Sequence, residues 1–356
     1  MRRRYLFAVV ILLGGSLFTS TTAGATDPQS HFALVNAALT KHIVPRMTAF
    51  RDAAEALPSQ VASVCETGED AEREELFGRF HRIVKAWAGI WFLRFGPLEQ
   101  SIRRERLSFW PDPRGVMARQ LREALAAKDP ALLVPGALRK TSAAIQGLPA
   151  LEALITSKEA PLGPGEDAAF RCGLAVAIAA NIDQTAREAA DGWLSDGGWK
   201  DKMLRPGSDN DTYREPSESA NEIMKSILTG LQLTGDVLVK PRLDPKFASG
   251  GAFEKSGLSK DFYMASVASL SELYDATAIE SYLPEDKDWA RNWAGGTWRA
   301  IKASDGLGGA ASSGANAGAP SLKELLARIS GLRQLVSKEM IPAAGLTVGF
   351  NELDGD

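Results

Sequence analysis

The segment Leu76-Phe-Gly-Arg-Phe-His-Arg-Ile-Val-Lys-Ala-Trp-Ala-Gly-Ile-Trp91 carries the clearest structural pattern of the chain. Its large apolar residues recur at steps of three and four, so they would line one face of an α-helix. The leucine-rich segment 322–335 follows the same period. No alternating β-branched run bounded by turn residues marks an extensive sheet. The sequence therefore predicts an all-α fold.

Helix start signals agree with this pattern. Ser321 with Glu324, and Ser219 with Glu222, have the spacing of a capping box, in which two side chains satisfy the first free N–H groups of a helix. Loops are predicted where Gly and Pro cluster. These loops lie at residues 161–165, 205–210, 241–245 and 308–320.

The N-terminus has the features of a secretory signal peptide. Arg2, Arg3 and Arg4 precede an apolar stretch over residues 5–18, and Ala23-Gly-Ala25 supplies a small-x-small cleavage pattern. The apolar stretch is shorter than the roughly 20 residues of a spanning helix. Cleavage would remove residues 1–25, and the first cysteine, Cys65, is too distant for a lipoprotein anchor. We therefore expect a periplasmic protein without a membrane span; retention as an uncleaved anchor is the alternative.

Length and charge narrow the class further. Loss of the three leader arginines from 41 Lys and Arg leaves 38 against 44 Asp and Glu, a net charge of about −6. Such a surface offers no electrostatic footprint for nucleic acid. The mature chain exceeds what one hydrophobic core usually fills. Long helical patterns on both sides of residue 195 predict an N-terminal bundle over 26–195 and a C-terminal bundle over 196–356.

Cys65 and Cys172 are the two cysteines of the chain. In an oxidising compartment, a pair of thiols is expected to form a disulfide. This bond would close a loop of about a hundred residues and could contribute a few kcal/mol. Two separate buried thiols are the alternative.

Three short blocks carry a family resemblance. They are Arg94-Phe-Gly-Pro97, Phe109-Trp-Pro-Asp112 with Arg114-Gly115 after it, and Gly147-Leu-Pro-Ala-Leu-Glu152. They resemble the core signature of the imelysin-like family, bacterial envelope proteins also classed as insulin-cleaving peptidases and often linked to iron acquisition. Weaker matches follow in the right order: His42-Ile-Val-Pro-Arg46, Arg103, Arg106, Arg205 to Tyr213, and Gly345 to Asn351 with Asp354-Gly-Asp356. The resemblance implies two helical bundles packed side by side with a cleft at their junction.

The family's name-giving motif is Gly-x-His-x-x-Glu, and here Pro149 stands at the histidine position. A histidine and a glutamate three residues apart on a helix could share a metal ion, but this chain lacks the histidine. Proline fits the first turn of a helix, so Pro149 marks a helix start with Glu152 one turn later. Glu152 then either stabilises that helix through its dipole or binds a ligand or metal.

Metal ligands are scarce. The chain has three histidines, His31, His42 and His81. His42 is the best candidate ligand, because Pro45 three residues later would bend its helix and Arg46 would lie on the same side. A surface or core histidine is the alternative reading. Carboxylates could hold a hard cation such as ferric iron or calcium. The available ones are Glu99, Asp112 and Glu152.

Arginines and aromatic residues gather in the same blocks. The arginines are Arg94, Arg103, Arg106 and Arg114, and the aromatics are Trp87, Trp91, Phe95 and Trp110. Guanidinium groups beside aromatic faces suit carboxylate, phosphate or sugar-acid ligands. We favour structural pairing, in which Arg94 and Arg103 contact Glu99, Asp112 or Glu152, because an unpaired buried charge is costly, and such pairing does not exclude ligand binding.

Support for peptidase chemistry is thin. The chain has no His-Glu-x-x-His helix and no recognisable nucleophile elbow. We therefore expect a non-catalytic periplasmic protein that binds iron or an iron complex. Outer-membrane uptake components are its expected partners. A metallopeptidase and a polysaccharide-binding or structural envelope protein are the alternatives. The predicted ligand site is the cleft between the bundles, lined by Arg94, Arg103, Trp110, Asp112 and Glu152 with His42 nearby, and Glu152 is expected to contact one of the arginines.

Overall fold

A computed structural model describes residues 28–244, 251–304 and 320–349. Across these ranges every regular element is helical and no strand occurs, which confirms the all-α prediction. None of the helices in these ranges is long and apolar enough to span a membrane. The predicted signal peptide, nearly all of the loop predicted at 308–320, and the end of the chain after residue 349 lie outside the described residues.

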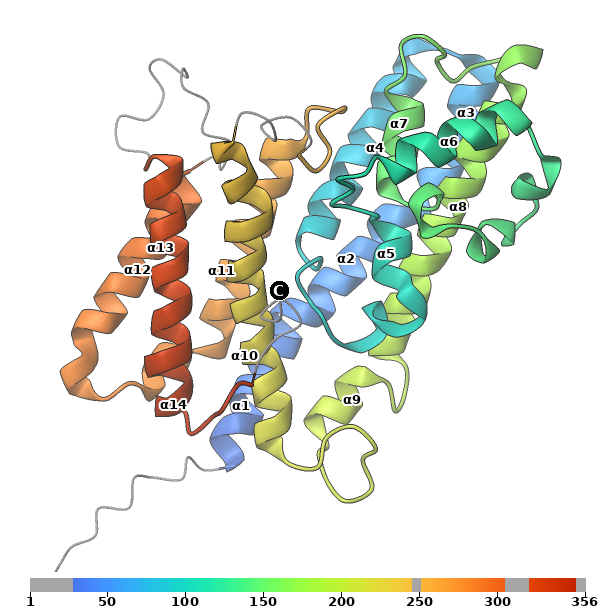
Figure 1. Cartoon of the computed structure of the whole chain (residues 1–356). Helices are drawn as coiled ribbons and strands as arrows, with labels where there is room; N and C mark the ends of the chain where they lie inside the picture. Colours follow the sequence, from blue (N-terminus) through green and yellow to red (C-terminus); the bar gives the residue numbers. More distant parts are fainter. Residues whose placement is uncertain (1–27, 245–250, 305–319, 350–356) are drawn as a thin grey trace, which may run out of the picture.

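One group of helices is built around a long central element (Figure 1). Helix α8 spans 29 residues and packs along two earlier helices, α2 and α3. Helix α4 packs against both of these. Helices α5 and α7 also pack against α8, and α6 packs against α7. The bounds are α2 (Val44–Glu55), α3 (Leu57–Thr67), α4 (Asp70–Ala88), α5 (Arg103–Leu107), α6 (Val116–Ala127), α7 (Leu148–Ile155) and α8 (Glu166–Leu194).

A second group packs beside the first (Figure 1). Helix α11 contacts α4, so it lies at the junction of the two groups. The members of the second group are α1 (Pro28–Ala38), α10 (Pro216–Leu233), α11 (Ser259–Thr277), α12 (Asp288–Ala303), α13 (Leu322–Leu335) and α14 (Ile341–Ala343). Helix α9 (Trp199–Leu204) lies in the connector that follows α8.

Short 3-10 turns fill many connections. They are η2 (Gly96–Leu98), η3 (Gln100–Ile102), η4 (Pro130–Leu133), η5 (Ala137–Lys140), η6 (Ala143–Ile145), η8 (Lys240–Leu243), η9 (Ile279–Tyr282) and η10 (Glu285–Lys287). The predicted loops at 161–165 and 205–210 are confirmed as non-helical. In the loop predicted at 241–245, residues 241–243 instead belong to the 3-10 turn η8, and residue 245 lies outside the described residues. The capping box of α13 is confirmed at Ser321 and Glu324, whereas that of α10 is formed by Glu215 and Glu218, because α10 begins at Pro216, before Ser219.

Three wide π turns interrupt the long helical paths, and a proline follows each one. They are η1 (Leu39–Ile43) before Pro45, η7 (Thr234–Val239) before Pro241, and η11 (Val336–Met340) before Pro342. Proline has no N–H to donate, and its ring crowds the carbonyl one turn earlier. A wider turn accommodates both effects, so the helical path can continue with a change of direction.

The first π turn carries the chain from one group to the other. Helix α1 packs against α10 and α11, whereas α2, on the far side of η1, packs against α8 (Figure 1). The predicted domain boundary at residue 195 stays a prediction, and α1 packs with helices that follow that boundary although it precedes it.

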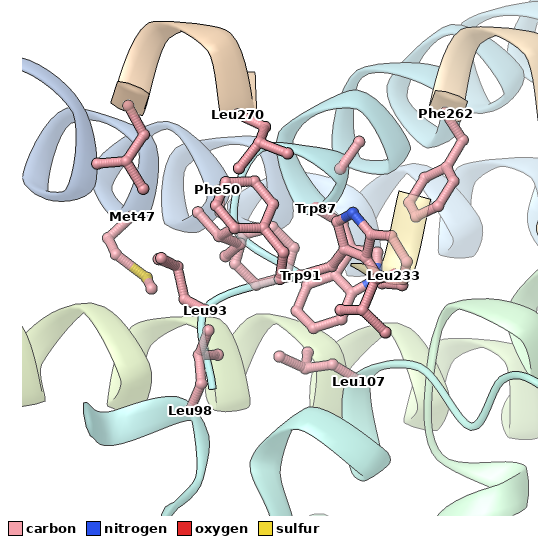
Figure 2. Packing of buried hydrophobic residues seen from close by; sticks show 14 of the residues in the cluster. Met47, Phe50, Trp87, Trp91, Leu93, Leu98, Leu107, Leu233, Phe262 and Leu270 are labelled. Atoms are coloured by element: carbon pink, nitrogen blue, oxygen red, sulfur yellow. The ribbon is translucent and has the colours of Figure 1, made fainter. Parts of the chain in front are cut away.

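The hydrophobic core is continuous across the junction. Figure 2 shows Met47 and Phe50 of α2 in the same cluster as Leu270 of α11. Trp87 of α4 and Trp91 lie nearby in this cluster with Phe262 of α11. Apolar burial stabilises by roughly 25 cal/mol per Å², so a core shared in this way holds the two groups together.

A disulfide joins Cys65 of α3 to Cys172 of α8, the pair that the sequence predicts. The two residues are 107 positions apart, and their Cα atoms are 5.7 Å apart. The bond therefore ties an early helix to the central helix of the same group.

We expect titration of the unreduced, unfolded protein with a thiol reagent to find no reactive thiol. Replacement of both cysteines by serine should lower the free energy of unfolding by about 2–5 kcal/mol, because the bond restricts the unfolded chain over a long loop. Chemical denaturation would measure this loss. Two titratable thiols in the wild-type protein would disprove the bond.

Candidate functional site

The glycine of the third block has a structural role. A Cβ atom on Gly147 would lie 2.3 Å from the carbonyl oxygen of Leu107 and 2.5 Å from that of Arg106. These distances are far below any normal contact, so the backbone before α7 can approach the end of α5 only with glycine at this position. Pro149 lies in the first turn of α7, as the sequence predicts.

Glu152 lies one turn into α7 and is 5% exposed. Its Oε1 atom accepts hydrogen bonds from the backbone N–H and the hydroxyl of Ser256, at 2.8 and 2.7 Å. Ser256 precedes α11, so this contact joins the two helix groups. Burial raises the pKa of Glu152, although the hydrogen bonds from Ser256 oppose the shift.

The expected contact between Glu152 and an arginine is absent from the described part of the chain, where no ion pair joins this carboxylate to Arg94 or Arg103. Arg103 instead donates to the carbonyl of Pro97 at 2.8 Å and pairs with Glu188 at 3.3 Å. The physical reason is that Glu152 and Arg103 have other partners, Ser256 for the carboxylate and Pro97 with Glu188 for the guanidinium.

The remaining arginines of the blocks have different surroundings. Arg106 is 4% exposed and donates to neutral acceptors, which are Gln146 at 3.0 Å and Asn181 and Thr185 at 3.2 Å each. Arg104 forms a two-pronged pair with Glu99, at 2.6 and 3.2 Å. Arg114 is exposed. Arg103, Arg104 and Arg106 are thus occupied by structural hydrogen bonds.

Asp112 also has a structural role. Its carboxylate accepts the backbone N–H groups of Val116 at 2.9 Å and Met117 at 2.8 Å, the first residues of α6. A carboxylate at a helix N-terminus satisfies free donors and is favoured by the helix dipole. The structure therefore uses Asp112 to begin a helix.

A small pocket lies where the two helix groups meet. Its walls are Trp87, Trp91, Arg94, Arg104, Ser108, Trp110 and Phe262. Phe262 comes from α11, whereas the other six belong to the first group or to the segments that follow α4 and α5. The ring of Trp91 lies 5.3 Å from that of Phe262 and 6.3 Å from that of Trp110. Of the five predicted ligand-binding residues, Arg94 and Trp110 line this pocket.

Two hydrogen-bond donors of the pocket residues are buried without a partner. They are Nε1 of Trp91 and Nε of Arg94, neither of which meets an acceptor among the described residues. An indole N–H and a guanidinium can only donate. An oxygen acceptor is therefore the complement that both groups lack.

His42 lies in the π turn η1 and is 1% exposed. Its Nε2 atom is 2.7 Å from Oγ of Ser269, and that hydroxyl donates to the carbonyl of Gly89 at 2.9 Å. A hydroxyl has one proton, so Nε2 of His42 must be the donor to Ser269. The other nitrogen, Nδ1, is then a buried acceptor without a partner in the described residues.

Burial, with a smaller contribution from Arg46, lowers the pKa of His42 to about 3 despite the hydrogen bond with Ser269. The imidazole is therefore neutral near pH 7. Through Ser269 it holds the carbonyl of Gly89, at the end of α4 and just before Trp91 and Arg94. His42 thus positions the segment that supplies two walls of the pocket.

No group of three or more His, Cys, Asp or Glu side chains that could hold a metal ion occurs in residues 28–244, 251–304 and 320–349. His42 and Glu152 have different partners, Ser269 and Ser256. Metal binding by either residue stays a prediction.

Several residues that complete the site could not be predicted from the sequence. Ser256, Phe262 and Ser269 belong to the second group, and Ser108 and Arg104 lie beside the family blocks. Nothing in a single serine or phenylalanine marks a partner more than a hundred positions away. Arg104 alone among these five had a signal, since it stands between Arg103 and Arg106.

The imelysin family model matches residues 43–287. No curated protein sequence matches significantly. The fold is similar to an imelysin-like protein from Psychrobacter arcticum 273-4, with a TM-score of 0.70 and 17% identity over 92% of this chain and 100% of that one. It is also similar to a protein from Parabacteroides distasonis ATCC 8503 named as a candidate iron-regulated protein A precursor. That match has a TM-score of 0.66 and 12% identity over 88% of this chain and 95% of the other.

Replacement of Gly147 by alanine should lower the free energy of unfolding by roughly 1–3 kcal/mol, because the new methyl group overlaps two backbone carbonyls. Gly207→Ala is the matched control, since a Cβ atom there meets no neighbour within 4 Å. Denaturant titration of both variants measures the difference. Equal stability of the two variants would contradict the close approach seen at Gly147.

The raised pKa of Glu152 predicts a pH dependence. The folded state holds this proton more tightly than the unfolded state, whose pKa is near the ordinary 4.5. The wild-type chain therefore loses stability as the pH rises above about 4.5 and through the folded pKa. Glu152→Gln keeps an oxygen acceptor for Ser256 and should remove this part of the loss.

Chemical denaturation of Glu152→Gln and of the wild type at about pH 5 and pH 7.5 would measure this loss. It is the change with pH in the difference between their free energies of unfolding. Glu159→Gln, at an exposed carboxylate beyond the end of α7, is the control. An Glu152→Gln variant that is destabilised more at the higher pH than at the lower one would show that the charged carboxylate is favoured in the fold, against this prediction.

Proposed function

This chain belongs to the imelysin family, and from that premise we propose that it is a non-catalytic binding protein of the periplasm that takes part in the uptake of iron or an iron complex. The ligand would bind in the pocket between the two helix groups. The protein would receive it from, or pass it to, outer-membrane uptake components.

The pocket at the junction is the observation that carries the proposal. Both helix groups contribute to its walls, and Trp91 and Arg94 bring buried donors that lack acceptors. Ligand sites commonly lie at such junctions, lined by aromatic residues with a few polar groups. The shared pocket also gives a bound ligand contacts with both groups at once.

Other features support the parts of the proposal that concern iron and location. One protein of similar fold is named as a candidate iron-regulated protein A precursor. The disulfide between Cys65 and Cys172 is typical of an oxidising compartment, as is the leader-like N-terminal sequence.

The state of the histidines favours binding over peptide hydrolysis. Hydrolysis needs an activated water or nucleophile, with a base that can take its proton. His42 is buried, neutral and bonded to Ser269, so it is poorly placed to meet a peptide substrate. The block that would carry a metal-binding histidine has Pro149 in its place.

Two measurements on the purified mature chain test this function. Calorimetric titration with ferric citrate should give saturable binding, and incubation with insulin chain or casein should give no cleavage above background, with or without added zinc. Casein digested by a commercial protease is the positive control. Metal-dependent cleavage that disappears in Glu152→Ala would replace the binding proposal with a metallopeptidase.

A further inference from the structure

We propose that the pocket between the helix groups binds a carboxylate group of an anionic ligand, which accepts hydrogen bonds from Nε of Arg94 and Nε1 of Trp91. The pocket would thus recognise an organic polycarboxylate, alone or as a metal chelate, and not a bare metal cation. This inference rests on the proposed function only for the identity of the metal, iron, that such a chelate would carry.

Two buried hydrogen-bond donors of the pocket residues lack an acceptor among the described residues. Buried polar groups of folded proteins nearly always have a hydrogen-bond partner, because a missing bond is costly. Trp91 and Arg94 line the same small pocket, and each has a buried N–H without an acceptor in the described part of the chain. One acceptor group with two oxygens would satisfy both.

The charge of the pocket favours an anion. Its seven lining residues include two arginines and no carboxylate. Glu99 balances the charge of Arg104 through two hydrogen bonds, whereas Nε of Arg94 has no such partner. A bare cation would be repelled by the guanidinium of Arg94, and an anion would be attracted. Hydrogen bonds from a guanidinium to a carboxylate are also stronger than neutral ones.

The shape of the pocket suits a small planar group. Trp87, Trp91, Trp110 and Phe262 supply flat apolar walls, which suit a planar group. The space between them holds about one water-sized group. The pocket therefore receives a functional group at the end of a ligand, while the rest of that ligand stays outside. Ser108 also lines the pocket and can add a hydroxyl donor.

Calorimetric titration of the full mature chain tests the assignment with three probes at matched ionic strength. The probes are citrate without metal, ferric citrate, and ferrous iron alone under anaerobic conditions. We expect saturable binding of citrate and ferric citrate and no binding of ferrous iron. Arg94→Gln should weaken the binding of both citrate probes at least tenfold, since it removes a charged donor.

Further variants separate this role from a general effect of charge or folding. Arg114→Gln removes an exposed arginine of the neighbouring block and should leave the affinity unchanged. Trp91→Phe keeps an aromatic wall but lacks the N–H, and Arg94→Lys keeps the charge but lacks Nε, so each should weaken citrate binding in part. Circular dichroism and a denaturation curve show which variants are folded. The conclusion uses the folded ones.

The outcomes distinguish this inference from the proposed function. Binding of ferrous iron without binding of either citrate probe would overturn the carboxylate site while supporting a role in iron binding. Equal binding of citrate and ferric citrate, lost in Arg94→Gln, would support the carboxylate site and speak against a role for iron. Absence of binding by both citrate probes, or equal affinity in Arg94→Gln and the wild type, would overturn the inference.

Discussion

The hydrogen bond between His42 and Ser269 is the contact on which the arrangement of the site depends. It joins the π turn between α1 and α2 to helix α11, and the hydroxyl of Ser269 donates in turn to the carbonyl of Gly89, two residues before Trp91. All of its members are buried at the junction of the two helix groups. Because a charged imidazole would be costly there, the low pKa of His42 keeps the link neutral. The path of the chain and the pocket wall are thus fixed together.

The helical fold could be predicted from the sequence because its causes are local. Apolar residues at steps of three and four define α4 and α13, and the capping pair Ser321 and Glu324 marks a helix start. The disulfide was predictable for a different reason, since two cysteines permit a single pairing. In contrast, the partners of the site residues are distant in sequence. Arg103 and Glu188 are 85 positions apart, and His42 and Ser269 are 227 positions apart.

The same distinction explains the candidate site. Arg94 and Trp110, which belong to the family blocks, line the pocket, whereas Asp112 and Glu152 have other roles. A carboxylate is equally suited to a ligand, an arginine, a helix N-terminus or a serine, and only packing decides among these partners. For Glu152 the decision was made by Ser256, which lies 104 positions later. Sequence patterns can therefore select the reactive residue types of a site without assigning their contacts.

The loss of the motif histidine leaves the architecture around it intact. Gly147 is still required by the close approach to α5, and Pro149 supports the start of α7 as well as a histidine could. The retained parts of the block thus have physical reasons that do not involve metal binding. The junction also contains the donors of Trp91 and Arg94, which lack acceptors among the described residues and lower stability while they stay unpaired. The continuous apolar core and the buried His42 link can hold the two groups together at that cost, so the fold is compatible with the ligand site that we propose there.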